Sequence, residues 1–254
     1  MRAIRRIIVL LAALLALAAA TASQARPAAR ITVLAASSLT NVLPQIDASA
    51  KYSFGGSDTL AGQIRLGAPA DVFAAANSSI PDKLYAQGLV EKPVVFTTNK
   101  LVLVTPRANP AGITSVFDLR KAGIKLIVGT RTVPVGSYTR TILKNLALSG
   151  VLSNVVSQET DVRSILGKVA LGEADAGFVY STDAKTVADK VNVIRLPAWA
   201  QPPIRYEIAI LKSSANRADA VAFINKVLAK AGQAKLRAAG FGAVKKGAAT
   251  YTGG

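Results

Sequence analysis

Short apolar runs alternate with helix-like segments along the chain from residue 31 onwards. The runs are continuous rather than alternating, as in ITVLAA (31–36), ADVFAAA (70–76) and AGFVYS (176–181), and such runs are typical of strands covered on both faces. One of the intervening segments, residues 162–169, carries apolar side chains at positions i, i+3, i+4 and i+7, which predicts an amphipathic helix. The alternation predicts an α/β fold with mostly parallel sheets flanked by helices.

The other apolar runs extend this pattern and suggest a division into two lobes. A long helical stretch, broken near Gly232, is expected over 217–239. We expect two strands, 101–106 and 206–211, to cross between the lobes. This places residues 31–103 and 208–254 in lobe 1 and residues 104–207 in lobe 2. Further strands are expected at 51–54, 125–129, 192–196 and 205–211.

The N-terminus has the layout of a secretory signal peptide. Three arginines (Arg2, Arg5 and Arg6) precede an apolar run at 7–20, and the small residues of TASQA follow. We therefore expect residues 1–25 to be removed and the mature chain to be periplasmic. The alternative is an uncleaved membrane anchor, but the run is shorter than the roughly 20 residues that a membrane-spanning helix needs.

Two absent residue types and a large positive charge limit the function. The chain has no cysteine and no histidine, which excludes disulfides, thiolate metal sites and Ser–His–Asp catalysis. Removing the signal peptide lowers the formal net charge from +17 to +14, and an excess of this size attracts anions. Lysine and arginine are scattered and only 6% of residues are aromatic, so we expect no nucleic-acid partner.

Four predicted strand-to-helix corners offer neutral hydrogen-bond donors. A helix start presents unpaired N–H groups and the positive end of the backbone dipole, so it can hold an anion without a countercharge. Such corners gather at the carboxyl ends of strands, where ligands of α/β proteins bind. Tyr180 ends one strand and could add a phenol. Taken singly, each corner is more often structural than functional. The corners are Ser37–Ser38, Gly55–Ser57, the turn at Val135 and the Asp161–Val162 step.

Several motifs together resemble the periplasmic molybdate-binding proteins of ABC importers. They are AASSLT, GAPADVF, VPVG, and TDVR followed by GFVYSTDA, and the resemblance covers about residues 31–244. It implies a two-lobed periplasmic binding protein fold of type II that closes over molybdate or tungstate and passes it to a membrane permease. It also implies a monomer with no cofactor and no enzymatic activity. The ligand-binding residues it implies are Ser38, Ser57, Val135, Val162 and Tyr180.

Two other functions remain as alternatives. The first is a binding protein for another tetrahedral oxyanion such as sulfate. The second is a histidine-free serine hydrolase, because GGSDT resembles the G-x-S-x-G nucleophile elbow. However, the last position of that motif differs, and no Ser-x-x-Lys spacing occurs in the chain.

Overall fold

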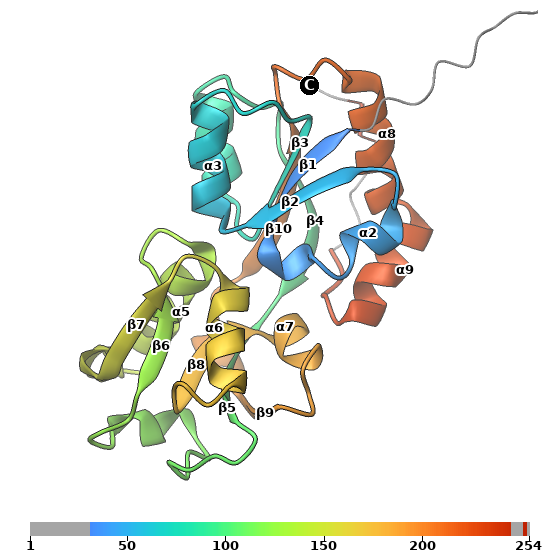
Figure 1. Cartoon of the computed structure of the whole chain (residues 1–254). Helices are drawn as coiled ribbons and strands as arrows, with labels where there is room; N and C mark the ends of the chain where they lie inside the picture. Colours follow the sequence, from blue (N-terminus) through green and yellow to red (C-terminus); the bar gives the residue numbers. More distant parts are fainter. Residues whose placement is uncertain (1–30, 245–250, 253–254) are drawn as a thin grey trace, which may run out of the picture.

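Two five-stranded sheets form the framework of the protein (Figure 1). The computed structural model describes residues 31–244 and 251–252, so the expected signal peptide lies outside the described residues. The first sheet has the order β2-β1-β3-β10-β4, with β1 Thr32–Ala36, β2 Lys51–Gly55, β3 Val72–Ala75, β4 Val94–Asn99 and β10 Ile204–Ile210. The second has the order β7-β6-β8-β5-β9, with β5 Leu101–Pro106, β6 Leu126–Gly129, β7 Val155–Glu159, β8 Ala176–Tyr180 and β9 Val191–Arg195.

The α/β class is confirmed, and each sheet is mixed, with one strand running against the other four. Strands β2, β1 and β3 are parallel, and β10 runs antiparallel to both β3 and β4. Likewise β7, β6 and β8 are parallel, and β5 runs antiparallel to β8 and β9. The parallel strands end at the junction between the sheets. The chain reaches β5 and β10 from the other sheet, so these two strands start at that junction. Strands β5 and β10 therefore run in the opposite direction.

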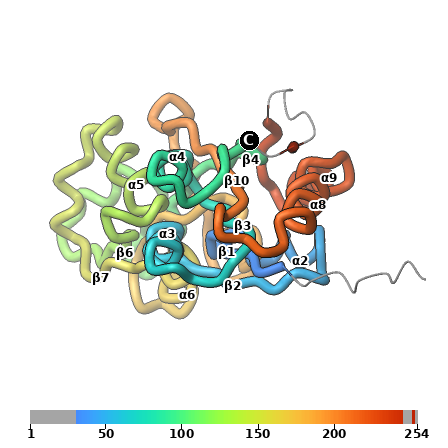
Figure 2. Tube along the Cα trace, turned by 90° about the horizontal axis from the view of Figure 1, so that it is seen from above, coloured from blue at the N-terminus to red at the C-terminus, as the bar shows by residue number. Residues whose placement is uncertain are grey.

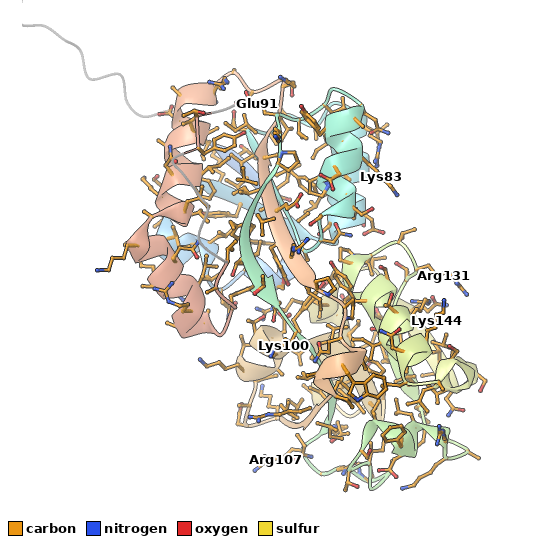
Figure 3. The ribbon with its side chains drawn as sticks, turned by 180° about the vertical axis from the view of Figure 1, so that it is seen from behind. Lys83, Glu91, Lys100, Arg107, Arg131 and Lys144 are labelled. Carbon is orange, nitrogen blue, oxygen red and sulfur yellow. The ribbon has the colours of Figure 1, made fainter. Side chains whose placement is uncertain are left out.

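The chain passes between the sheets twice. Only Lys100 separates β4 from β5, and Figure 3 shows it where the two halves of the molecule meet. The return path runs from β9 to β10 through the 3₁₀ turn η4 (Ala198–Ala200). Gln201 joins the two paths, because its side chain hydrogen-bonds both N–H and C=O of Leu101. We propose that these two passages bound the lobes, the first lobe built on the first sheet and the second lobe on the second.

Helices cover both faces of the first sheet (Figure 2). On one face, Leu34 and Phe73 pack with Leu60 of α3. On the other, Val33 belongs to the core that contains Phe223 of α8. The side chains of neighbouring strand residues thus point to opposite faces of the sheet, as the pleat requires. The helices of this lobe are α2 (Leu43–Ile46), α3 (Ser57–Arg65), α4 (Ser79–Ala86), α8 (Arg217–Leu228) and α9 (Lys230–Ala239).

Helical elements also surround the second sheet. They are α5 (Pro134–Asn145), α6 (Val162–Ala170), α7 (Ser181–Lys185), η2 (Val116–Arg120) and η3 (Ser149–Asn154). In the part of the chain that the structure describes, no helix is both long and apolar enough to cross a bilayer.

The long C-terminal helix is interrupted at a different residue from the one predicted. The break falls at Ala229, whose ψ of 157° is extended, three residues before Gly232. Gly232 instead lies inside α9, where an added Cβ would be 2.2 Å from the carbonyl oxygen of Lys226. The glycine is needed because α8 and α9 approach closely, so it marks packing rather than a helix end.

Candidate functional site

A pocket of about 190 Å³, including its open mouth, lies where the two lobes meet. Its walls come from the carboxyl ends of β1, β2 and β8 and from the starts of α3, α5 and α6. All of the residues predicted from the sequence line it: Ser38, Ser57, Val135, Val162 and Tyr180, together with Ser37. The structure thus brings these residues together, and their contact with a ligand remains a proposal.

Ser57 is the first residue of α3 and is buried. Its Oγ accepts a hydrogen bond from the backbone N–H of Ala76 at 3.1 Å. An amide N–H can only donate, so the serine oxygen acts as acceptor in this bond and its own proton stays free. Ser57 can therefore donate a hydrogen bond into the pocket.

Ser38 lies in the 3₁₀ turn η1 (Ser37–Leu39) and not at the cap of an α-helix. Its Oγ is 2.9 Å from the hydroxyl oxygen of Tyr206, which comes from β10. Ser37 directs its carbonyl to Thr40, accepting from both the backbone N–H and the hydroxyl. This interaction holds the turn that places Ser38 at the end of β1.

Two helix starts supply backbone donors from the second lobe. In α5 the first residue is Pro134, which has no N–H, and Val133 provides no side-chain cap. In α6 the carboxylate of Asp161 accepts the N–H groups of Arg163 and Ser164. The N–H groups of Val135 and Val162 lie in these first turns, where the helix itself offers no acceptor. Both can therefore donate to an anion.

The start of α5 depends on a close backbone approach. A Cβ on Gly136 would lie 1.9 Å from the carbonyl oxygen of Thr130 and 2.4 Å from that of Gly129. Glycine lets the first turn of α5 pack directly against the end of β6, which fixes the position of the neighbouring Val135.

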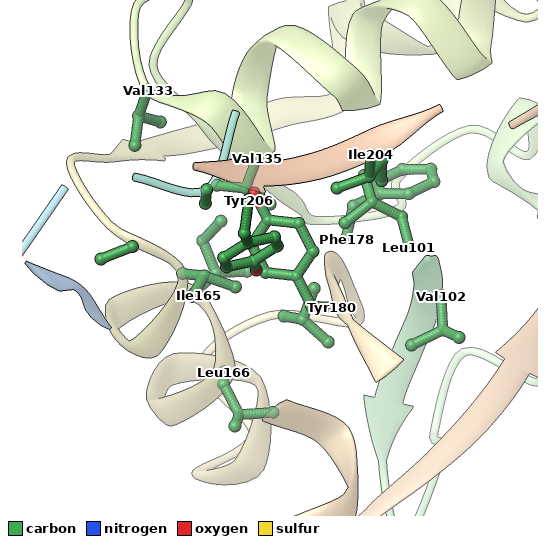
Figure 4. Packing of buried hydrophobic residues seen from close by; sticks show 14 of the residues in the cluster. Leu101, Val102, Val133, Val135, Ile165, Leu166, Phe178, Tyr180, Ile204 and Tyr206 are labelled. Carbon is green, nitrogen blue, oxygen red and sulfur yellow. The ribbon is translucent and has the colours of Figure 1, made fainter. Parts of the chain in front are cut away.

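Tyr180 ends β8 and is 1% exposed. Its hydroxyl has no hydrogen-bond partner among the described residues. Burial, reinforced by the neighbouring Tyr206, raises the pKa of Tyr180 well above its usual value, so the phenol remains protonated and can donate. The two tyrosine rings meet edge to face with centroids 5.7 Å apart, close to Val135 (Figure 4).

Among the residues that the structure describes, no lysine or arginine lines the pocket, and Asp161 is the only acidic residue that does. The Asp161 carboxylate is engaged by its own helix, since it also accepts from the hydroxyl of Ser164 at 2.7 Å. Across residues 31–244 and 251–252, no group of three or more His, Cys, Asp or Glu side chains could hold a metal ion. The pocket therefore offers neutral donors, an arrangement suited to an anion without a bound proton.

The two lobes touch each other beside the pocket. Gly56 lies so near the second lobe that an added Cβ would be 2.1 Å from the carbonyl oxygen of Thr160. The hydroxyl of Thr132 in the second lobe donates to the Asp58 carboxylate in the first. The guanidinium of Arg163 reaches the side-chain oxygen of Asn41 at 3.3 Å. These contacts close the two lobes around the pocket.

Comparison with known proteins identifies the family. Residues 12–242 match the model of the family described as bacterial extracellular solute-binding protein. The chain belongs to this family. It is 38% identical over 234 residues to the molybdate-binding protein ModA of Mycobacterium tuberculosis, covering 88% of each chain. It is 32% identical to ModA of Haemophilus influenzae, covering 85% of this chain and 91% of that one. These matches confirm the resemblance seen in the sequence.

Solved structures of solute-binding proteins share the fold. The periplasmic molybdate-binding protein of Azotobacter vinelandii aligns with a TM-score of 0.76 at 25% identity, covering 85% of this chain and all of that one. The sulfate-binding protein SubI of Mycobacterium tuberculosis aligns with a TM-score of 0.71 at 19% identity, covering 85% and 88%. At that lower identity the match to SubI shows the fold alone. The expected two-lobed fold of type II is thereby confirmed.

Sequence reasoning missed two residues next to the site of this solute-binding protein. Tyr206 contacts Ser38, and Asn99 in turn contacts Tyr206 at 3.3 Å. Tyr206 lies 168 positions from Ser38 and inside an otherwise ordinary strand, so no local pattern indicates their contact.

Proposed function

We propose that this solute-binding protein captures molybdate, and also tungstate, between its lobes and delivers the anion to the membrane permease of an ABC importer. The observation that carries the proposal is the convergence of uncharged donors from both lobes on one pocket whose described lining residues include no lysine or arginine. Two relatives that match over 88% and 85% of the chain are named molybdate-binding proteins, which supports the choice of anion.

The donor set favours a fully deprotonated tetrahedral dianion. Each hydroxyl or N–H that donates to such an anion makes a charge-assisted hydrogen bond, which is stronger than a neutral one. Hydrogen phosphate carries a proton and needs an acceptor. The Ser57 oxygen already accepts from Ala76, and the Asp161 carboxylate accepts from its own helix. A protonated anion would therefore have to use a pocket hydroxyl as the acceptor for its proton, and that hydroxyl would be diverted from donating to the anion, which loses a charge-assisted bond.

The remaining parts of the proposal concern location and chemistry. We propose a periplasmic, monomeric protein whose residues 1–25 are removed on export, and which has no enzymatic activity. In the described structure Ser38 bonds only a tyrosine hydroxyl and Ser57 only a backbone amide. Neither serine has a general base within hydrogen-bond reach, which argues against the hydrolase alternative.

Thermal unfolding of the mature protein with four sodium salts tests the proposal. A ligand at 100 times its Kd stabilises the folded state by about 2.7 kcal/mol, which corresponds to roughly 5–10 °C in Tm for a protein of this size. We expect this shift with molybdate and tungstate. At the same concentration we expect none with hydrogen phosphate, because it carries a proton, and none with sulfate, because its tetrahedron is smaller than that of molybdate. An equal shift with sulfate would reject the assigned specificity, and no shift with any salt would reject oxyanion binding.

A further inference from the structure

A buried chain of hydrogen bonds leads from the junction of the lobes to Ser38. It begins at Asn99, the last residue of β4. The side-chain oxygen of Asn99 accepts from the backbone N–H of Lys100 at 2.9 Å and from the hydroxyl of Ser181 at 3.1 Å. Because a backbone N–H can only donate, it fixes which end of the amide is the oxygen.

The amide nitrogen of Asn99 consequently faces two hydroxyls. It donates to Thr182 Oγ1 at 2.9 Å and to Tyr206 Oη at 3.3 Å. Since the tyrosine oxygen receives a proton from Asn99, its own proton must point elsewhere. Among the described residues the partner in place for that proton is Ser38 Oγ, at 2.9 Å. The Ser38 oxygen then acts as acceptor, and its proton remains available to the pocket.

The residues of this hydrogen-bond chain are shielded from solvent. Asn99 is 8% exposed, Ser38 4% and Tyr206 0%. With little access for water, a reversed direction would leave two donors facing each other between Asn99 and Tyr206, with no solvent to satisfy them. The direction of the bonds is thus set by covalent structure at Lys100.

We infer that Asn99 and Tyr206 are positioning residues that make Ser38 present its proton, rather than a lone pair, to the bound anion. The inference rests on the proposed function and deepens it, because it names residues that contribute to selecting unprotonated over protonated oxyanions. Ser57 reaches the same state more directly, through the N–H of Ala76. Both serines are therefore held as donors by protein groups, Ser57 by the N–H of Ala76 and Ser38 by the hydroxyl of Tyr206.

Replacing Asn99 with aspartate should reverse the direction of the hydrogen bonds from Asn99 through Tyr206 to Ser38. A carboxylate still accepts from Lys100 and Ser181, but in place of the amide nitrogen it presents a second acceptor. The Tyr206 hydroxyl would then donate to this carboxylate and accept from Ser38, which would turn a lone pair of Ser38 toward the pocket. Molybdate would lose a donor, and hydrogen phosphate would gain an acceptor for its proton.

Calorimetric titration of two sets of variants tests the inference. The first set is a double-mutant cycle of Tyr206→Phe and Ser38→Ala with molybdate. We expect Tyr206→Phe to weaken binding about tenfold in the wild-type background and less than about twofold when Ser38 is already alanine. Tyr52→Phe is the matched control, because its hydroxyl bonds carbonyls of Leu43 and Asp47 within the first lobe. This control should lower stability without changing affinity.

The second set compares Asn99→Asp with wild type at about pH 8, where molybdate and hydrogen phosphate both carry two negative charges and are repelled alike by the new carboxylate. We expect the ratio of molybdate to hydrogen phosphate affinity to fall at least about tenfold, and to stay unchanged when Ser38→Ala is also present. If Asn99→Asp does not fold, the cycle with Tyr206→Phe decides alone.

The outcomes separate the inference from the function on which it rests. A wild-type protein that binds no molybdate would reject the proposed function. A wild-type protein that binds molybdate, but loses the same affinity on Tyr206→Phe with and without the Ser38 hydroxyl, would overturn the inference alone. An unchanged affinity ratio in folded Asn99→Asp would overturn it as well.

Discussion

Gly56→Ala should prevent the lobes from closing while leaving the backbone of each lobe in place. Within the first lobe only the side chain of Asp58, whose Oδ1 would lie 2.9 Å from the new Cβ, has to shift. Gly56 has φ −63° and ψ 136°, which alanine adopts freely. The new methyl carbon would lie 2.1 Å from the Thr160 carbonyl oxygen, whereas such carbon–oxygen contacts are ordinarily about 3.3 Å. The second lobe must therefore retreat by roughly 1.2 Å. That displacement would stretch a hydrogen bond of about 2.9 Å beyond its useful length.

The expected cost is at least one charge-assisted bond. Thr160 lies two residues before Val162, so the N–H of Val162 is the first donor to be withdrawn. Losing one such bond costs about 1.5–3 kcal/mol, a rise in the Kd for molybdate of roughly 10- to 150-fold. Calorimetric titration measures this change, and thermal unfolding without ligand should give a Tm close to that of wild type.

Gly62→Ala is the matched control for this prediction. Gly62 lies inside α3, the helix that starts directly after Gly56, and nothing would come within 4 Å of its Cβ. Alanine there should stabilise the protein by about 0.5–1 kcal/mol and leave the Kd unchanged. Wild-type affinity in Gly56→Ala would refute the reasoning, because it would show that the contact with Thr160 plays no part in the ligand-binding form.

The remaining predictions concern individual donors, a helix cap and a buried acid. Ser57→Ala and Tyr180→Phe should each weaken molybdate binding by about 1.5–3 kcal/mol, and wild-type titrations for both would remove these residues from the site. Asp161→Ala removes the cap of α6 and should lower the free energy of unfolding in urea by about 0.5–2 kcal/mol; an unchanged value would show that the cap contributes nothing. Burial raises the pKa of Asp183 to about 7 despite its ion pair with Arg163. The folded state then holds this proton more tightly than the unfolded state. The resulting contribution to the free energy of unfolding is complete below about pH 4 and is lost as the pH rises toward 7. Chemical unfolding measured between about pH 4 and 7 should show a flatter decline of the free energy of unfolding for Asp183→Asn than for wild type. The same pH dependence in both proteins would contradict the raised pKa of Asp183.

The sequence predicts those elements of the fold that depend on residues close to one another along the chain. The helix starts at Ser57 and Val162 can be predicted because glycine, serine and aspartate act within a few residues of themselves. The runs that became β1 and β8 are recognisable because both faces are buried. Strands β4 and β7 were missed. Each lies at the edge of its sheet with partly exposed side chains, so its apolar pattern is interrupted.

The arrangement of the site depends on topology and could not be predicted in the same way. The contact of Tyr206 with Ser38 exists because β10 enters the first sheet from the junction of the lobes, and no pattern near either residue indicates that path. The break between α8 and α9 was predicted near Gly232 instead of at Ala229 for a related reason. Gly232 interrupts the sequence pattern, but its role is to allow α8 and α9 to approach each other.

A crystal structure of the mature protein grown with sodium molybdate, with molybdenum located by its anomalous scattering, tests the central claim most directly. Our account predicts one strong molybdenum peak in the pocket, its oxygens within hydrogen-bond distance of the Ser38, Ser57 and Tyr180 hydroxyls and of the N–H groups of Val135 and Val162. A peak beside lysine or arginine side chains elsewhere, or an empty pocket at saturating molybdate, would contradict it.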